Sequence, residues 1–117
     1  MGKIAITING SDPTNIFPAF IQASSAVALG EDVIVFFTPY GAPALKKGEL
    51  EKMKVEGMPD IVDLYESVIE LDGQIMMCEL ATKVNDIAED DFREGAQLVG
   101  MTTFLIEAKD SYLTFSY

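Results

Sequence analysis

Apolar residues recur along the chain with two periods, one typical of strands and one of helices. Residues 4–8 are rich in β-branched side chains, and residues 33–37 form a continuous apolar run. Such a run is expected where helices cover both faces of a strand, so residues 33–37 are predicted to be central in a parallel sheet. Residues 74–78 predict a third buried strand and residues 96–99 a short fourth. Residues 111–116 alternate as in a strand near a sheet edge.

The first helix is predicted over residues 13–29. Asp12 is its candidate N-cap, and Pro13 suits the first helical position because an N–H there would have no partner within the helix. Gly30 can adopt the left-handed conformation that ends a helix. Residues 44–58 mix lysines, glutamates and glycines without a clear period. They are predicted to form the longest irregular segment, which we expect to be mobile.

Three further helices follow from the same pattern. Asp60 is predicted to cap a helix over residues 61–72, which Gly73 closes. Residues 79–85 predict about two helical turns directly after the third strand. Residues 101–108 carry apolar side chains at i, i+3, i+4 and i+7 and predict a small helix near the end of the chain.

Strands that alternate with helices, without a linker or an internal repeat, predict one domain over residues 1–117. The expected fold class is α/β, a three-layer α/β/α sandwich with a mostly parallel five-stranded sheet. Ligands of such folds bind beyond the carboxyl ends of the strands, where loops converge. The candidate loops are residues 9–12, 38–43 and 78–79.

Charge and composition narrow the possible partners and the compartment. The 19 acidic and 8 basic residues give a net charge of −11, which repels nucleic acid and anionic membrane surfaces. The longest apolar stretches are far shorter than the ~20 residues of a membrane-spanning helix. The N-terminal residues carry no secretory or myristoylation signal, and the single cysteine suits a reducing compartment. We therefore expect a cytoplasmic protein that binds neither nucleic acid nor membranes.

Residue counts exclude several kinds of site. With no histidine and one cysteine, the chain cannot build a Ser-His-Asp or Cys-His arrangement or a soft-metal site. No phosphate-binding glycine-rich loop or dinucleotide fingerprint is present. A phosphorylatable receiver domain needs an aspartate where the third strand ends, and Cys78 occupies that position. The sequence therefore predicts no metal and no cofactor.

Cys78 is the one position with distinctive chemistry, and two interpretations of it remain open. Free cysteine is often a small, buried and inert hydrophobe. A thiol in the first turn of a helix, however, is favoured as the thiolate by the helix dipole and by free N–H groups. Glu79 places a negative charge beside it, so Lys46, Lys47 or basic groups of a partner are needed to compensate.

The loops around Cys78 supply the candidate substrate contacts. These candidates are Asn9, Thr38, Tyr40, Gly41 and Glu79. An equally direct interpretation is that the polar members serve only as turn and cap residues and that Tyr40 packs over the sheet edge.

Four segments resemble the DsrE/DsrF-like sulfur-relay family, particularly its small DsrE-type members, over nearly the whole domain. They are residues 36–42, the lysine-containing loop up to Gly48, residues 74–78 and residues 94–105. The resemblance implies that Cys78, at the position of the family's sulfur-carrying cysteine, holds sulfur as a persulfide. It implies sulfurtransferase-type chemistry without an organic cofactor, assembly into homo-oligomers or hetero-oligomers, and a TusA-like carrier or other thiol protein as partner. Because the chain has one cysteine, any relay must run between molecules.

The leading hypothesis is a small sulfur carrier that accepts sulfane sulfur on Cys78 and passes it to a partner thiol. The alternative is a non-catalytic oligomeric subunit or binding module of the same fold, in which Cys78 is structural. A third hypothesis is an unrelated enzyme that uses carboxylates on a small ligand. Reactivity of the thiol near neutral pH separates the first two, since a buried structural cysteine resists alkylation.

Overall fold

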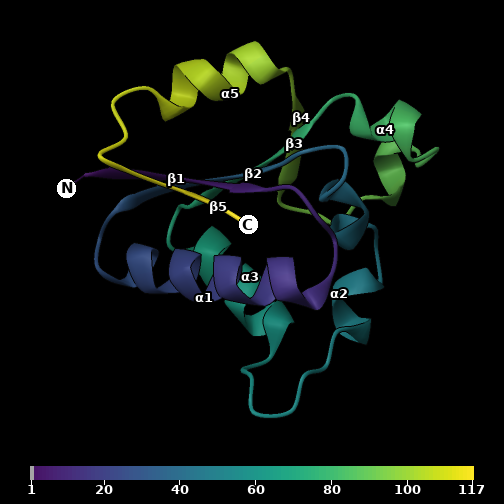
Figure 1. The fold of residues 1–117 in the computed structure, drawn as a ribbon, viewed down its shortest axis with the longest axis horizontal. Helices are drawn as coiled ribbons and strands as arrows, with labels where there is room; N and C mark the ends of the chain where they lie inside the picture. Colours follow the sequence, from purple (N-terminus) through teal and green to yellow (C-terminus); the bar gives the residue numbers. More distant parts are fainter. Residues whose placement is uncertain (1) are drawn as a thin grey trace.

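The computed structural model describes residues 2–117, which fold around a five-stranded sheet with the order β4-β3-β2-β1-β5 (Figure 1). All four pairings are parallel, β2 lies at the centre and β5 at one edge, as the apolar patterns predict. The predicted α/β fold class is confirmed. The strands are β1 (Lys3–Ile8), β2 (Asp32–Phe37), β3 (Gln74–Cys78), β4 (Ala96–Val99) and β5 (Leu113–Ser116).

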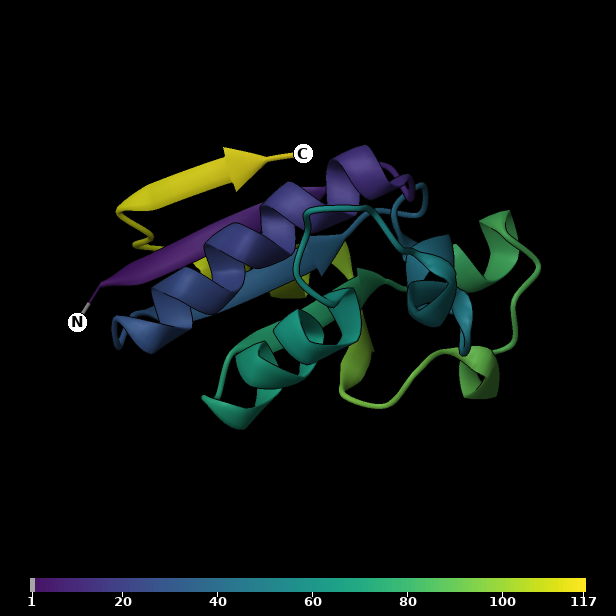
Figure 2. The same cartoon turned by 90° about the horizontal axis from the view of Figure 1, so that it is seen from below.

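Helices cover the two faces of the sheet unequally. Two helices, α1 (Pro13–Ala28) and α3 (Ile61–Glu70), lie side by side on one face, and α5 (Met101–Ala108) lies on the other (Figures 1 and 2). Because side chains of a strand point alternately to the two faces, β2 and β3 contribute to the cores on both faces of the sheet. The predicted three-layer arrangement is confirmed, with one helix in the third layer.

The hydrophobic core is divided accordingly. The larger cluster lies between the sheet and the α1 and α3 helices, and Ile6, Val35 and Phe37 in it are fully buried. The smaller cluster faces α5 and consists of Ile34, Phe36, Met76, Cys78 and Phe104. The sequence predicts both faces of β2 as buried, and both are.

At the ends of α1, the predicted positions of Pro13 and Gly30 are confirmed, and the predicted side-chain cap is wrong. Pro13 occupies the first helical position, and Gly30, with φ of 87°, directly follows the C-cap. The Asp12 side chain makes no capping hydrogen bond, so its predicted role as an N-cap is wrong in that respect. Its backbone carbonyl accepts the N–H of Asn15 at 2.9 Å and that of Ile16 at 3.1 Å.

The predicted start of α3 is confirmed, because the Asp60 carboxylate accepts the N–H of Val62 at 2.9 Å. Its end differs from the prediction. The left-handed residue is Asp72, with φ of 67°, and Gly73 comes next, its N–H donating to the carbonyl of Val68 at 2.8 Å. Glycine is required at 73 by close approach, since a Cβ there would lie 2.5 Å from Val68 Cγ1.

The segment predicted as irregular, residues 44–58, contains short helices in its first half. A 3-10 helix, η1 (Ala42–Leu45), and one turn of α-helix, α2 (Glu49–Lys52), occupy it. Both are anchored by apolar side chains, with Leu45 and Leu50 fully buried. Because these isolated apolar residues do not recur with a helical period, the sequence pattern does not predict η1 or α2. A second short 3-10 helix, η2 (Glu89–Asp91), follows later and adjoins the same region, where the N–H of Lys47 donates to the carbonyl of Asp91.

Within residues 2–117, no helix combines the length and the apolar character needed to cross a membrane.

Candidate functional site

Cys78 is the last residue of β3, at the carboxyl edge of the sheet. Its side chain belongs to the smaller core under α5, and the residue is 4% exposed. In that cluster the rings of Phe36 and Phe104 stack with their centroids 4.3 Å apart. The thiol is therefore almost inaccessible to a reagent while this cluster stays closed.

The segment that follows Cys78 is not the predicted helix of about two turns. The N–H of Glu79 donates to the carbonyl of Val99 at 2.9 Å, which extends the ladder between β3 and β4 by one residue. Only a single turn, α4 (Ala81–Val84), comes next, and Asp86 with φ of 52° ends the helical path. Cys78 thus lies outside any helix. The prediction that its thiol lies in the first turn of a helix is wrong.

Glu79 is exposed and lies near the start of α5. A Cβ built on Gly100, the N-cap of α5, would lie 3.5 Å from Glu79 Oε1. A carboxylate near a helix N-terminus is stabilised by the partial positive charge there. The lysines expected to offset Glu79 lie elsewhere: Lys46 and Lys47 line two cavities beside Glu49 and Glu51.

The turn after β2 brings the other predicted contacts together. Thr38 Oγ1 donates to Asn9 Oδ1 at 2.7 Å and accepts the N–H of Tyr40 at 3.2 Å. The N–H of Gly41 donates to the Thr38 carbonyl at 3.0 Å, and a Cβ on Gly41 would lie 2.5 Å from the carbonyl oxygen of Ile8. The polar atoms of Asn9 and Thr38 therefore hold this turn, while the Tyr40 side chain is left 67% exposed.

This turn lies next to Cys78. The pairing of Phe37 with Met77 places the residues after β2 and the end of β3 side by side. Asn85 links the two, because its Nδ2 donates to the carbonyl of Pro39 at 2.8 Å and to that of Ala81 at 3.0 Å. Asn85 is not predictable from the sequence, since nothing in a single asparagine after a helix indicates a partner 46 residues away.

Apolar side chains are exposed around this edge. Leu80 and Val84, just after Cys78, are 54% and 55% exposed. Together with Tyr40 they give the carboxyl edge near the thiol an apolar surface, which suits contact with another protein.

A family model described as DsrE/DsrF-like matches residues 2–116. The chain belongs to the DsrE/DsrF-like family. The resemblance inferred from the four sequence segments is thereby confirmed.

Curated relatives of this DsrE/DsrF-like chain include one with a named function. A protein of Allochromatium vinosum named sulfur carrier protein DsrE2 is 26% identical, and the match covers 93% of this chain and 94% of that protein. An uncharacterized protein of Methanocaldococcus jannaschii, MJ0760, is 28% identical over 76% of this chain. This chain spans only 32% of the length of that protein.

Two solved structures share the fold of this family member along its full length. The ychN protein from E. coli has a TM-score of 0.81 at 16% identity, and each chain is covered completely. Protein MTH1491 of Methanobacterium thermoautotrophicum has a TM-score of 0.77 at 11% identity, again over both whole chains. At these identities the likeness establishes the fold.

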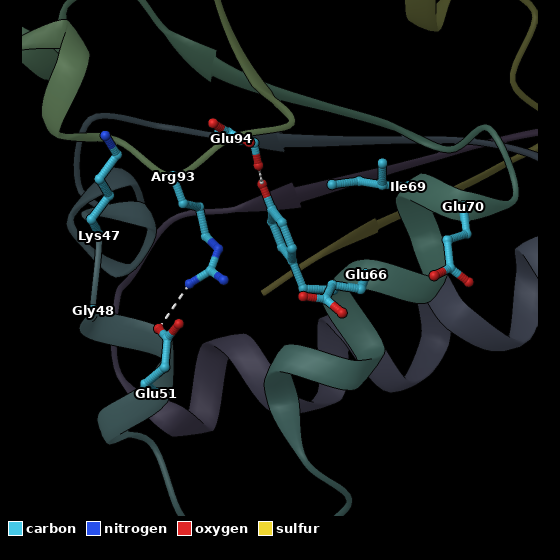
Figure 3. A pocket seen from close by; sticks show the side chains of 9 residues that line it. Lys47, Gly48, Glu51, Glu66, Ile69, Glu70, Arg93 and Glu94 are labelled. Atoms are coloured by element: carbon cyan, nitrogen blue, oxygen red, sulfur yellow. Dashed lines mark hydrogen bonds and ion pairs between the residues drawn. The ribbon is translucent and has the colours of Figure 1, made fainter.

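A cavity of about 420 Å³ in this DsrE/DsrF-like domain is lined by none of the predicted site residues (Figure 3). Within it Arg93 Nη1 lies 2.9 Å from Glu51 Oε1, and this guanidinium holds the pKa of Glu51 below its usual value. The guanidinium also lies 5.0 Å from the centre of the Tyr65 ring. Burial raises the pKa of Tyr65 to about 12, and its hydroxyl donates to the carbonyl of Glu94 at 2.9 Å. Arg93 and the Tyr65 hydroxyl therefore each have a bonding partner within the lining of this cavity.

Proposed function

We propose that this chain is a sulfur carrier in which Cys78 accepts sulfane sulfur and passes it to a thiol of another protein. The observation that carries the proposal is the position of the chain's single thiol. It ends β3 at the carboxyl edge of a parallel sheet, where ligands of such folds bind, in a member of the DsrE/DsrF-like family. The name of the Allochromatium vinosum relative supports the same chemistry.

The transfer consists of two thiol exchange steps that need no oxidant. The Cys78 thiolate attacks the outer sulfur of a donor persulfide, R–S–SH, and an S–S bond forms as the donor S–S bond breaks. The products are Cys78–S–SH and the thiolate R–S⁻, which takes the electron pair. An acceptor thiolate, A–S⁻, then attacks the outer sulfur of Cys78, giving A–S–SH and the free Cys78 thiolate. Thiosulfate can replace the donor persulfide, with sulfite as the leaving group.

Access to the thiol requires a movement of the residues that cover it, because Cys78 is 4% exposed, and we expect α5 to be the part that moves. The helix is short, with eight residues, and Phe104 is its one buried side chain. The free energy needed to open this small contact is expected to be lower than that needed to open the larger core. We expect a partner, such as a TusA-like carrier, to dock on the apolar edge near Leu80 and Val84 and to exploit this opening.

Intact-mass spectrometry tests the loading step. The wild-type chain and the Cys78→Ala variant are incubated with inorganic polysulfide, and excess donor is removed before measurement. Wild type is expected to gain the mass of one sulfur atom, which dithiothreitol removes, and Cys78→Ala to gain none. A wild-type chain without any sulfur adduct, or an equal adduct on Cys78→Ala, contradicts the proposal.

A second candidate function, a non-catalytic subunit or binding module, is favoured by the same burial of Cys78. In that case the thiol contributes only packing beside Met76 and Phe104. Iodoacetamide distinguishes the two functions. A structural Cys78 is alkylated only when the protein is denatured, whereas a carrier thiol reacts in the folded state near neutral pH.

A further inference from the structure

One carboxylate, that of Glu79, lies beside the residues that cover the Cys78 thiol. Glu79 directly follows Cys78, so the two Cα atoms are about 3.8 Å apart. The Glu79 side chain is exposed, and a Cβ built on Gly100 would lie 3.5 Å from its Oε1 and 4.0 Å from its Oε2. Gly100 is the N-cap of α5, the helix whose Phe104 closes the cluster over the thiol. The carboxylate therefore borders the place where we expect that cluster to open.

The chain segments that meet around this edge carry little other charge. These strand ends, turns and short helices are residues 4–11, 33–41, 74–85 and 96–104. Their charged residues are Glu79 and Lys83 alone, and Lys83 is soon followed by four acidic residues, Asp86, Glu89, Asp90 and Asp91. Among residues 2–117, neither Glu79 nor Lys83 belongs to an ion pair. The partial positive charge at the start of α5, about half an elementary charge, offsets the carboxylate only in part.

The charge of Glu79 acts on a sulfur donor according to the charge of that donor. A donor with a negative charge is repelled as it approaches the thiol, and one with a positive charge is attracted. The effect is larger than in open water, because Phe36, Met76 and Phe104 surround the thiol with apolar groups. The net charge of −11 acts in the same direction at longer range.

We propose that Glu79 is a specificity-determining residue of the carrier step, which selects donors whose sulfane sulfur is carried by an uncharged or cationic group. The proposal rests on the proposed sulfur-carrier function. Glu79 forms no bond to sulfur: the Cys78 thiolate attacks the donor sulfur, an S–S bond forms as the donor S–S bond breaks, and the donor thiolate leaves with the electron pair. Thiosulfate, a dianion, is then a slow donor, although an excess of an anionic donor still loads the thiol.

Three small disulfides that differ in charge measure this selection. Cystamine carries ammonium groups, bis(hydroxyethyl) disulfide is uncharged, and dithiodipropionate carries carboxylates. Each reacts with Cys78 by the same exchange, which releases one probe thiol and leaves a mixed disulfide that intact-mass spectrometry detects. Each rate constant is divided by that of N-acetylcysteinamide, which removes the intrinsic reactivity of the probe. The ratio of two probes on one chain is then independent of how often the cluster opens, because opening affects all probes equally.

Wild type is expected to react with cystamine at least about tenfold faster than with dithiodipropionate after this correction. Glu79→Gln should lower that ratio at least about threefold, Glu79→Lys should lower it further, and Glu79→Asp should retain it. Glu66→Gln is the matched control, because Glu66 is an exposed carboxylate on α3 across the sheet, and it should leave the ratio nearly unchanged. If Glu79 were merely structural, its replacement would change both rates together and leave the ratio as in wild type.

Thiosulfate extends the test to a sulfur donor. Its rate of loading, divided by the rate of bis(hydroxyethyl) disulfide on the same chain, should rise at least about threefold in Glu79→Gln. Equal corrected rates for the three disulfides, or ratios that Glu79→Gln leaves unchanged, overturn this inference but not the carrier function, because sulfur loading of wild type is measured separately. A folded chain whose Cys78 reacts with none of the probes overturns both.

Discussion

Cys78 is the chain's one thiol, and the residues that cover it limit access to it. The thiol lies in a cluster closed on the α5 side by Phe104, whose ring stacks on Phe36. The proposed carrier function therefore depends on opening of this cluster.

Phe104→Ala is expected to increase the alkylation rate of Cys78 in the folded protein, because it removes the ring that closes the cluster. It should also destabilise the chain by about 3 kcal/mol through the cavity it leaves. The rate is measured with iodoacetamide and the stability by urea unfolding. Leu105→Ala is the control, since Leu105 is exposed and should change neither quantity much. Equal alkylation rates in wild type and Phe104→Ala would show that another movement exposes the thiol.

Tyr65 is expected to make stability fall at alkaline pH. Burial raises its pKa in the folded state to about 12, above the ordinary value of 10.0. The unfolded chain therefore loses this proton first, so stability is fully present below about pH 10 and decreases as the pH rises towards 12. The loss should be on the order of 2 kcal/mol. Denaturant unfolding of wild type and Tyr65→Phe across this range measures it, and identical slopes for the two proteins would contradict the assignment.

At the scale of elements, two aspartates that look alike in sequence behave differently. Asp60 and Asp12 both precede a helix, but only the Asp60 side chain accepts helical N–H groups. Asp60→Ala should cost about 1 kcal/mol of unfolding free energy, the usual contribution of such a cap. Asp12→Ala, its matched control, should cost less than half as much. Comparable losses in urea unfolding would mean that the Asp12 side chain also caps.

The elements that the sequence predicts correctly are those with a local apolar pattern, either a helical or strand period or a continuous run. All five strands and the helices α1, α3 and α5 follow from local apolar spacing. The short helix after Cys78 does not, because the hydrogen bond from Glu79 to Val99 joins residues far apart in the chain. The same holds for Asn85, whose partner is the Pro39 carbonyl.

The candidate site is predictable only in part for the same reason. Cys78 stands out because it is the chain's one thiol, and its place at the end of β3 follows from the strand pattern. The strand pattern also predicts burial at residues 74–78, but the covering of Cys78 by Phe104 of α5 depends on tertiary packing, which no local pattern contains. The hydrogen bond between Thr38 and Asn9 is likewise not predictable from local sequence, because it depends on the ends of β1 and β2 lying side by side.

At the scale of the whole molecule, the two faces of the sheet are covered unequally. The helices α1 and α3 lie on one face and α5 alone on the other, so the core that contains Cys78 is the smaller of the two (Figure 1). A net charge of −11 also repels other anionic molecules at long range.

The central claim, that Cys78 carries sulfur between molecules, is tested most directly by a single-turnover transfer. Wild-type chain loaded with sulfur is freed of donor and mixed with a reduced TusA-like carrier protein, and both intact masses are followed over time. We predict that this chain loses the mass of one sulfur atom while the acceptor gains it. A loaded chain that keeps its sulfur, or that loses it without any gain on the acceptor, would contradict the account.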